Sequence, residues 1–222
     1  MNITPKLRGF LAFCLILLLV GCGLSESRIR REKESEARHK LGIANLNSSA
    51  PNVQKAYIEF LEAVKINPEN KDAHYALGHV YAQREDYPKA ILEFQATIAI
   101  APNYSEAHNY LGNIYETLGK DAEAILSYQE ALKNLQYETP QFPHWHLGLI
   151  YVRQNQLEKA RASFKEAVAV APSDHMAHYL LASFYFQKGP RELASNEFKK
   201  VIALAPQSPE AENAKKNLES LK

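Results

Sequence analysis

Cysteine is scarce in this sequence, and neither sign of charge prevails. The 222 residues include two cysteines, and 26 basic against 25 acidic residues give a formal net charge of +1. Such a balance gives no electrostatic reason to expect nucleic acid as a partner. Hydrophobic residues make up 46% of the chain, a value typical of folded domains that excludes disorder throughout.

The sequence also lacks the motifs of several common enzyme classes. It contains no glycine-rich phosphate loop, no Gly-x-Ser-x-Gly elbow and no His-Glu-x-x-His pair. Acidic residues are frequent, but solvated helix faces account for them. We therefore expect no enzyme, no catalytic residue, no cofactor and no small-molecule substrate.

The first residues have the features of an export signal. Lys6 and Arg8 precede an apolar run over residues 10–20, which is too short for a membrane helix of about 20 residues. A basic start, a short apolar core and the small residue Gly21 are typical of a secretory signal peptide, which is removed from the mature protein.

The end of this run, Leu19-Val20-Gly21-Cys22, resembles a bacterial lipobox. The resemblance implies cleavage before Cys22 and acylation of its sulfur and amine, with palmitate as one acyl group. Two or more acyl chains give a stable membrane anchor. Because Cys14 would leave with residues 1–21, the mature chain forms no disulfide and no cysteine metal site. The alternative is an ordinary signal peptide followed by a chance cysteine.

The residue after Cys22 bears on which membrane retains the lipoprotein. In enterobacterial sorting an aspartate there tends to retain a lipoprotein in the inner membrane, and this sequence has Gly23 instead. By analogy we expect a lipid anchor in the outer membrane, with the protein facing the periplasm.

A period of 34 residues runs through the remainder of the chain. Pro68 and Pro102 are 34 residues apart, as are Gly78 and Gly112, whereas Gly148 follows Gly112 after 36 residues, so two residues are inserted near 133–143. Small residues in this register let two helices approach closely, and prolines mark the turn to the next unit. A tyrosine follows each small residue at a fixed distance, at Tyr81, Tyr115, Tyr151 and Tyr185.

This pattern resembles the tetratricopeptide repeat, a helix–turn–helix unit. The resemblance covers residues 37–208 and implies an all-α, right-handed superhelical solenoid of about five repeats with a polar C-terminal capping helix. The expected parts are a signal peptide at 1–21, the lipidated cysteine and a charged tether at 22–36, repeats at 37–70, 71–104, 105–140, 141–174 and 175–208, and the cap at 209–222. Within the tether, residues 23–27 are expected to be flexible, whereas residues 27–38 mix both charges and can extend the first helix.

Four of the eight histidines occupy one position of the repeat. They are His74, His108, His144 and His178. The position favours a flat side chain at the helix interface, and residues one repeat apart do not converge on one ion. We therefore predict no metal site.

The resemblance also places a partner-binding groove on the first helix of each repeat. Its residues are Tyr75, His79, Asn109, Asn113, Glu116, Trp145, Leu149, Val152, Tyr179, Ser183 and Phe186. This groove is polar in the middle and apolar toward the C-terminal repeats, and it contains the only tryptophan, a common binding anchor. The Lys/Asn/Arg set that clamps a free carboxylate in some family members is absent, so we expect an apolar helix or strand to dock. The alternative is that Trp145, Leu149 and Val152 pack under the insertion or against a neighbouring repeat.

The insertion suggests a narrower relationship. Leu135-x-Tyr137-x-Thr139-Pro140 precedes the fourth repeat, and together with the lipobox and the repeat number it resembles the type IV pilus lipoproteins of the PilF/PilW/Tgl family. The resemblance implies a pilotin-like scaffold whose protein partner is an outer-membrane secretin. The alternative is a general envelope scaffold for cell-wall enzymes or for an export system, and genomic neighbours would discriminate between the two.

Overall fold

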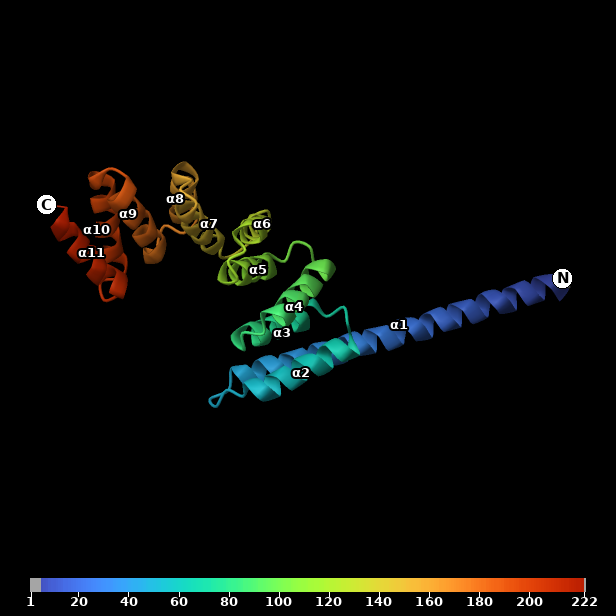
Figure 1. The fold of residues 1–222 in the computed structure, drawn as a ribbon. Helices are drawn as coiled ribbons and strands as arrows, with labels where there is room; N and C mark the ends of the chain where they lie inside the picture. Colours follow the sequence, from blue (N-terminus) through green and yellow to red (C-terminus); the bar gives the residue numbers. More distant parts are fainter. Residues whose placement is uncertain (1–4, 222) are drawn as a thin grey trace. The chain divides into compact units, whose positions relative to one another are not determined.

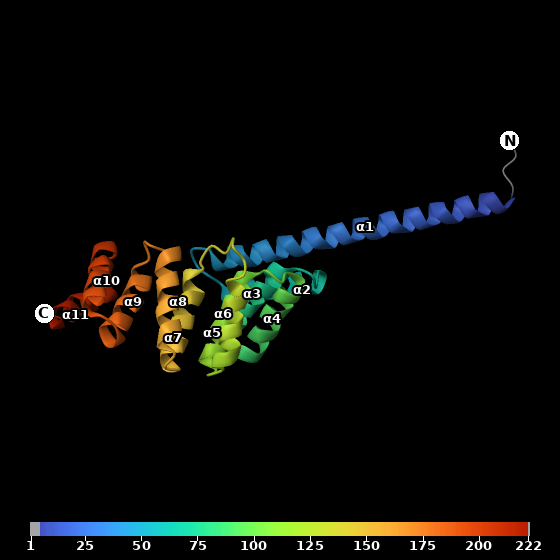
Figure 2. The same cartoon turned by 90° about the horizontal axis from the view of Figure 1, so that it is seen from above.

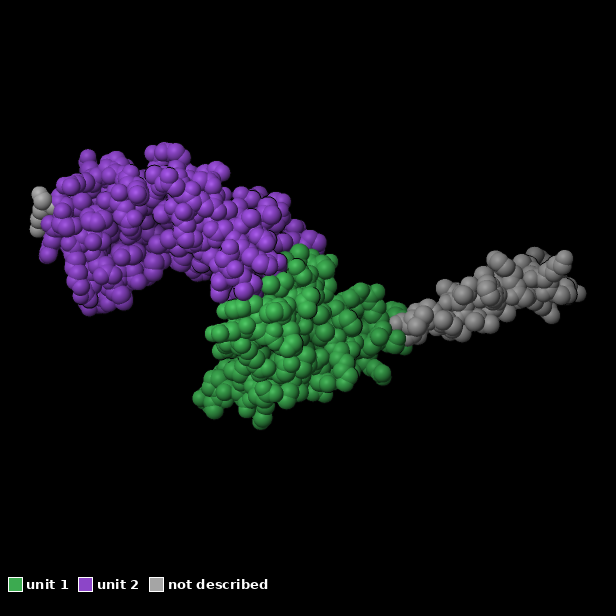
Figure 3. Space-filling view, in the orientation of Figure 1, with its two compact units in different colours: residues 1–101 green, residues 102–222 purple. Residues whose placement is uncertain are grey.

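The computed structural model describes the backbone of residues 5–221 and the side chains of residues 25–221. Within this part the chain forms eleven helices and no strand, which confirms the predicted all-α class. The chain divides into two compact units, residues 1–101 and residues 102–222 (Figure 3). Each unit is built from pairs of consecutive antiparallel helices joined by short turns (Figures 1 and 2).

The helices pair in chain order. The first unit contains α1 (Pro5–Leu46) with α2 (Val53–Ile66), and α3 (Lys71–Gln83) with α4 (Tyr87–Ile100). The second unit contains α5 (Ser105–Thr117) with α6 (Asp121–Ala131), α7 (Gln141–Arg153) with α8 (Leu157–Val170), and α9 (His175–Lys188) with α10 (Arg191–Leu204). The last helix, α11 (Pro209–Ser220), packs on α10 and buries Ala211 and Ala214.

The turn inside three of the pairs has one conformation. Glu85, Gly119 and Asn155 occupy equivalent positions and have φ angles of +60°, +71° and +56°. Glycine adopts this left-handed region without steric cost, whereas other L-residues pay about 1–2 kcal/mol there. The recurrence at equivalent positions follows the sequence period, so the repeat fixes the turn as well as the helices.

Helix starts are capped by side chains where the sequence supplies them. The side-chain oxygens of Asn52, Asn70 and Asp86 accept hydrogen bonds from the backbone N–H three residues later. Such caps satisfy donors that the first turn of a helix leaves free, and each stabilises its helix by about 1 kcal/mol. Asn70 begins a new helix pair, whereas Asn52 and Asp86 begin the second helix of a pair, so polar residues mark helix starts at both kinds of turn.

A glycine and an aromatic ring hold each of the first four pairs together. The rings of Phe60, Phe94, Tyr128 and Phe164 are almost fully buried, and a Cβ added at Gly42, Gly78, Gly112 or Gly148 would overlap the facing ring. Absence of a side chain at these glycines thus sets the distance between the two helices. In the fifth pair Ala182 takes the equivalent position and is fully buried.

The N-terminal helix differs from the expectation for the tether. Residues 23–27 continue α1 and do not form a flexible segment. Charged residues with high helix propensity follow, and ion pairs between Arg28 and Glu32 and between Glu36 and Lys40 join successive turns. Residues 25–34 are exposed, and Arg28 among them pairs with Glu69, which follows α2, at 3.2 Å. Ser35 is the first buried residue of the described side chains, and its hydroxyl donates to the Ala63 carbonyl over 2.7 Å.

The interpretation of the first residues stays a prediction. The side chains of residues 1–24 lie outside the described part, and with them the expected lipidation site Cys22. A search of the described helices found none that is both long and apolar enough to cross a membrane.

Replacing Gly112 tests the helix contact. We expect Gly112→Leu to lower the free energy of unfolding by about 1–3 kcal/mol or more, because the new side chain overpacks against the Tyr128 ring. The measurement is thermal unfolding of Gly112→Leu beside Gln129→Leu, a control that introduces the same leucine side chain at an exposed position of α6. A melting temperature equal to that of the unchanged chain would show that this register is wrong.

Candidate functional site

The repeated histidines connect secondary structure and do not gather into a site. The His74 ring lies 2.6 Å from Glu93 of α4 and 3.1 Å from the carbonyl oxygen of Pro68. The hydrogen bond to Glu93 raises the pKa of His74. His178 repeats this arrangement with Glu197 and Pro172. Across residues 25–221, no three His, Cys, Asp or Glu side chains are grouped so that they could hold a metal ion.

The two expected groove residues of the first unit pack against its core. Tyr75 and His79 meet edge-to-face with ring centroids 4.6 Å apart, and both lie near Phe94. Burial lowers the pKa of His79 to about 4. At neutral pH His79 is therefore an uncharged aromatic contact within the α3–α4 pair.

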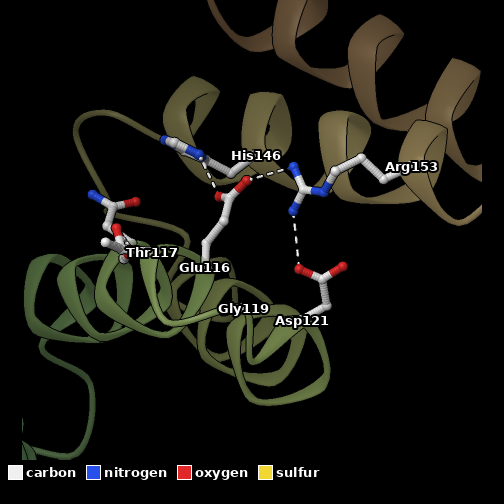
Figure 4. A pocket seen from close by; sticks show the side chains of 7 residues that line it. Glu116, Thr117, Gly119, Asp121, His146 and Arg153 are labelled. Carbon is white, nitrogen blue, oxygen red and sulfur yellow. Dashed lines mark hydrogen bonds and ion pairs between the residues drawn. The ribbon is translucent and has the colours of Figure 1, made fainter.

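In the second unit, Glu116 of α5 is the centre of a polar network (Figure 4). One carboxylate oxygen accepts from His146 Nδ1 over 2.9 Å, and the other accepts from Arg153 Nη1 over 2.9 Å. Arg153 also donates from Nη2 to Asp121 over 2.9 Å. Arg153 and His146 reach these carboxylates from α7, so the network joins the third helix pair to the fourth.

Tyr128 ties this network to the core. Its hydroxyl lies 2.8 Å from Asn113 Oδ1 and 3.0 Å from Glu116 Oε2, and its single proton can donate to either. The His146 ring stacks on the Tyr128 ring at a centroid distance of 5.1 Å. The ring that packs against Gly112 thus also positions Glu116.

Electrostatics explain why Glu116 is held ionised. Burial alone would raise its pKa, but hydrogen bonds from His146 and Arg153 outweigh burial and lower the pKa to about 2. The same carboxylate raises the pKa of Tyr128, after burial as the main cause. A carboxylate with so low a pKa is a weak base at neutral pH.

The network borders a cavity of about 600 Å³. Its wall combines two of the expected groove residues, Asn113 and Glu116, with Thr117, Gly119, Asp121, His146 and Arg153. Sequence reasoning missed Asp121, His146 and Arg153. The repeat register could have indicated Arg153, because Val152 is the counterpart of Glu116 in the next repeat and Arg153 follows it directly.

A second, apolar cavity of about 80 Å³ lies one helix pair further along. Three expected groove residues, Leu149, Val152 and Ser183, line it together with Leu180 and Phe184. The change from a polar to an apolar surface toward the C-terminus is therefore present within the second unit. Two further expected residues, Tyr179 and Phe186, have rings beside the core ring of Phe198.

Trp145 and Asn109 are less accessible than the expected groove requires. Trp145 is half-buried and packs edge-to-face on Phe142 with centroids 4.8 Å apart, so part of its surface contacts the insertion. Asn109 is 6% exposed. Trp145 Nε1 and Asn109 Oδ1 are buried without a hydrogen-bond partner in the structure, which costs about 1–3 kcal/mol per atom.

Family models of the tetratricopeptide repeat match most of residues 59–209. Models described as tetratricopeptide repeat match residues 59–92, 105–135 and 147–209, and one described as TPR repeat matches residues 78–119. No curated protein matches the chain.

Solved structures share the fold at low sequence identity. PilW, a widely conserved type IV pilus biogenesis factor, is 21% identical with a TM-score of 0.68, over 84% of this chain and 90% of PilW. PilF of Pseudomonas aeruginosa is 17% identical with a TM-score of 0.73, over 86% of this chain and 90% of PilF. YrrB, a TPR protein with an unusual peptide-binding site, is 24% identical with a TM-score of 0.59, over 78% of this chain and 88% of YrrB.

The pKa of Glu116 predicts how stability depends on pH. Because folding lowers this pKa from 4.5 to about 2, the contribution is complete above pH 4.5 and is lost as the pH falls toward 2. We expect Glu116→Gln to cost about 2 kcal/mol at pH 7, allowing for the exposed Arg153. Urea unfolding between pH 2 and 7 measures this, with Glu123→Gln as an exposed control on α6. A cost that stays constant over this range would contradict the assignment.

Proposed function

Because this chain is a tetratricopeptide-repeat protein whose fold resembles those of PilW and PilF, we propose that it is a membrane-anchored scaffold for type IV pilus secretin assembly. Its first-helix face holds a segment of the secretin, and its lipid keeps the complex at the outer membrane. The observation that carries the proposal is the pair of neighbouring cavities on α5, α7 and α9, which expected groove residues line.

The proposed anchor fits the described part of α1. If Cys22 carries the lipid, the exposed residues 25–34 lie between the membrane and Ser35, the first buried residue of the described side chains. Ten helical residues span about 15 Å. Arg28 within this segment already pairs with Glu69, so the segment keeps the repeats near the membrane, and anchoring raises the local concentration of whatever they bind.

The similar proteins support a binding role. YrrB is described as having a peptide-binding site, and PilW as a pilus biogenesis factor. Both descriptions belong to those proteins, and the shared fold extends them to this chain as a proposal. We propose no catalytic step, because hydrogen bonds to both oxygens of Glu116 leave it a weak base.

Capture from solubilised envelopes tests the proposal. With the full, lipidated chain as bait we expect a secretin in the eluate, and we expect Trp145→Ala to reduce its recovery at least tenfold. Leu126→Ala is the control, since it removes an apolar side chain that is 62% exposed on the second helix α6. Circular dichroism establishes that each variant is folded.

Two outcomes would contradict the proposal. A cell-wall hydrolase or an export component in place of the secretin would remove the pilus assignment while leaving the scaffold role. Equal recovery of the secretin with folded Trp145→Ala and with folded Leu149→Ala, a residue that lines the apolar cavity, would show that the partner binds elsewhere than in the groove.

A further inference from the structure

We infer that the first-helix face of the second unit recognises an extended protein segment that carries a basic side chain and, one repeat further along, an aliphatic side chain. The inference rests on the proposed function and specifies the chemistry of the segment. Its basis is the different lining of the two neighbouring cavities.

The larger cavity favours a cation. Two carboxylates, Glu116 and Asp121, line it with one guanidinium, that of Arg153, and with His146. Of the two carboxylate oxygens of Asp121, Arg153 bonds only Oδ1. The other oxygen points away from the Arg153 guanidinium (Figure 4). That oxygen is an acceptor for a lysine or arginine of the partner. Charge-assisted hydrogen bonds of this type are stronger than neutral ones.

Two helix ends also lie at this cavity. The helix α5 ends at Thr117, and α6 begins at Asp121, and both residues line the cavity. The partial negative charge of the first end and the partial positive charge of the second oppose each other. The preference for a cation therefore rests on the two carboxylates.

The smaller cavity favours an aliphatic side chain. Five of its eight lining residues are apolar, and Leu149 among them is 36% exposed. The apolar residues are Leu149 and Val152 of α7, Phe164 of α8, and Leu180 and Phe184 of α9, and Ser183, Gln187 and Lys188 complete the wall. A volume of about 80 Å³ suits one branched side chain. Burying such a side chain from water contributes about 1.5–3 kcal/mol.

The spacing of the cavities sets the spacing in the partner. They lie on successive helix pairs, and packed helices are about 8–10 Å apart. An extended chain covers that distance in about three residues, at 3.3 Å each. The expected pattern is a lysine or arginine three residues from a leucine, isoleucine or valine.

Two unpaired polar atoms near the cavities are compatible with an extended segment. Trp145 Nε1 and Asn109 Oδ1, both on first helices, are buried without partners in the structure. Neither residue lines the two cavities, so each side chain would have to turn outward before the free N–H and C=O groups of an extended segment could pair with it. Trp145 is only half-buried, so movement of its ring is compatible with the fold.

Selection from a displayed library of random twelve-residue peptides tests the inference. The full chain in detergent micelles is the bait, and affinities of selected synthetic peptides are measured by fluorescence anisotropy. We expect enrichment of a basic residue three positions from an aliphatic one. Asp121→Asn and Leu149→Ala should each weaken binding about tenfold, while the matched controls Glu123→Gln and Leu126→Ala should change it less than twofold.

A second variant changes the charge of the larger cavity but leaves the Asp121–Arg153 ion pair in place. It distinguishes loss of charge recognition from loss of local structure. Thr117 is exposed on the cavity wall, and Thr117→Lys adds a positive charge there. We expect at least tenfold weaker binding of the selected basic peptide, and recovery when glutamate replaces its basic residue. A loss without that recovery overturns the charge assignment.

The remaining outcomes separate this inference from the proposed function. Peptides that require Trp145 but share a different chemistry, acidic residues above all, overturn the inference and leave groove binding intact. A selection that yields no peptide sensitive to Asp121→Asn, Leu149→Ala or Trp145→Ala overturns both.

Discussion

The close contact between a glycine on a first helix and an aromatic ring on the second helix determines the rest of this structure. It fixes the separation of the helices in four pairs, from Gly42 with Phe60 to Gly148 with Phe164. The contact uses one side of each first helix for the core. Side chains on its other side are then free to form a surface, and in the second unit that surface contains the two cavities.

The third pair shows how the core contact also builds the candidate site. Tyr128 takes the position that phenylalanine has in the neighbouring pairs, and its ring packs on the same glycine contact. The added hydroxyl reaches Asn113 and Glu116. One oxygen atom on a buried ring thereby orients a carboxylate at the surface, and the arginine and histidine of α7 complete its hydrogen bonding.

The repeat spacing predicts the parts of the structure that depend on local contacts. The periodic glycines, tyrosines and prolines place the helix pairs, and the same register brings Leu149, Val152 and Ser183 to one cavity. Burial of Asn109 was not predictable, because the exposure of a repeat position depends on what covers it. Arg153 was missed because its long side chain reaches across to α5 and α6. The helical state of residues 23–27 was missed because their glycine and two serines favour a flexible segment, whereas ion pairs further along α1 support the helix.

Hydrogen–deuterium exchange of the full chain, alone and saturated with detergent-purified secretin, tests the central claim that a partner lies on the first helices. We expect slower exchange in α5, α7 and α9 on binding and unchanged exchange in α8 and α10. Protection confined to α8 and α10, with the first helices unchanged, would contradict this claim.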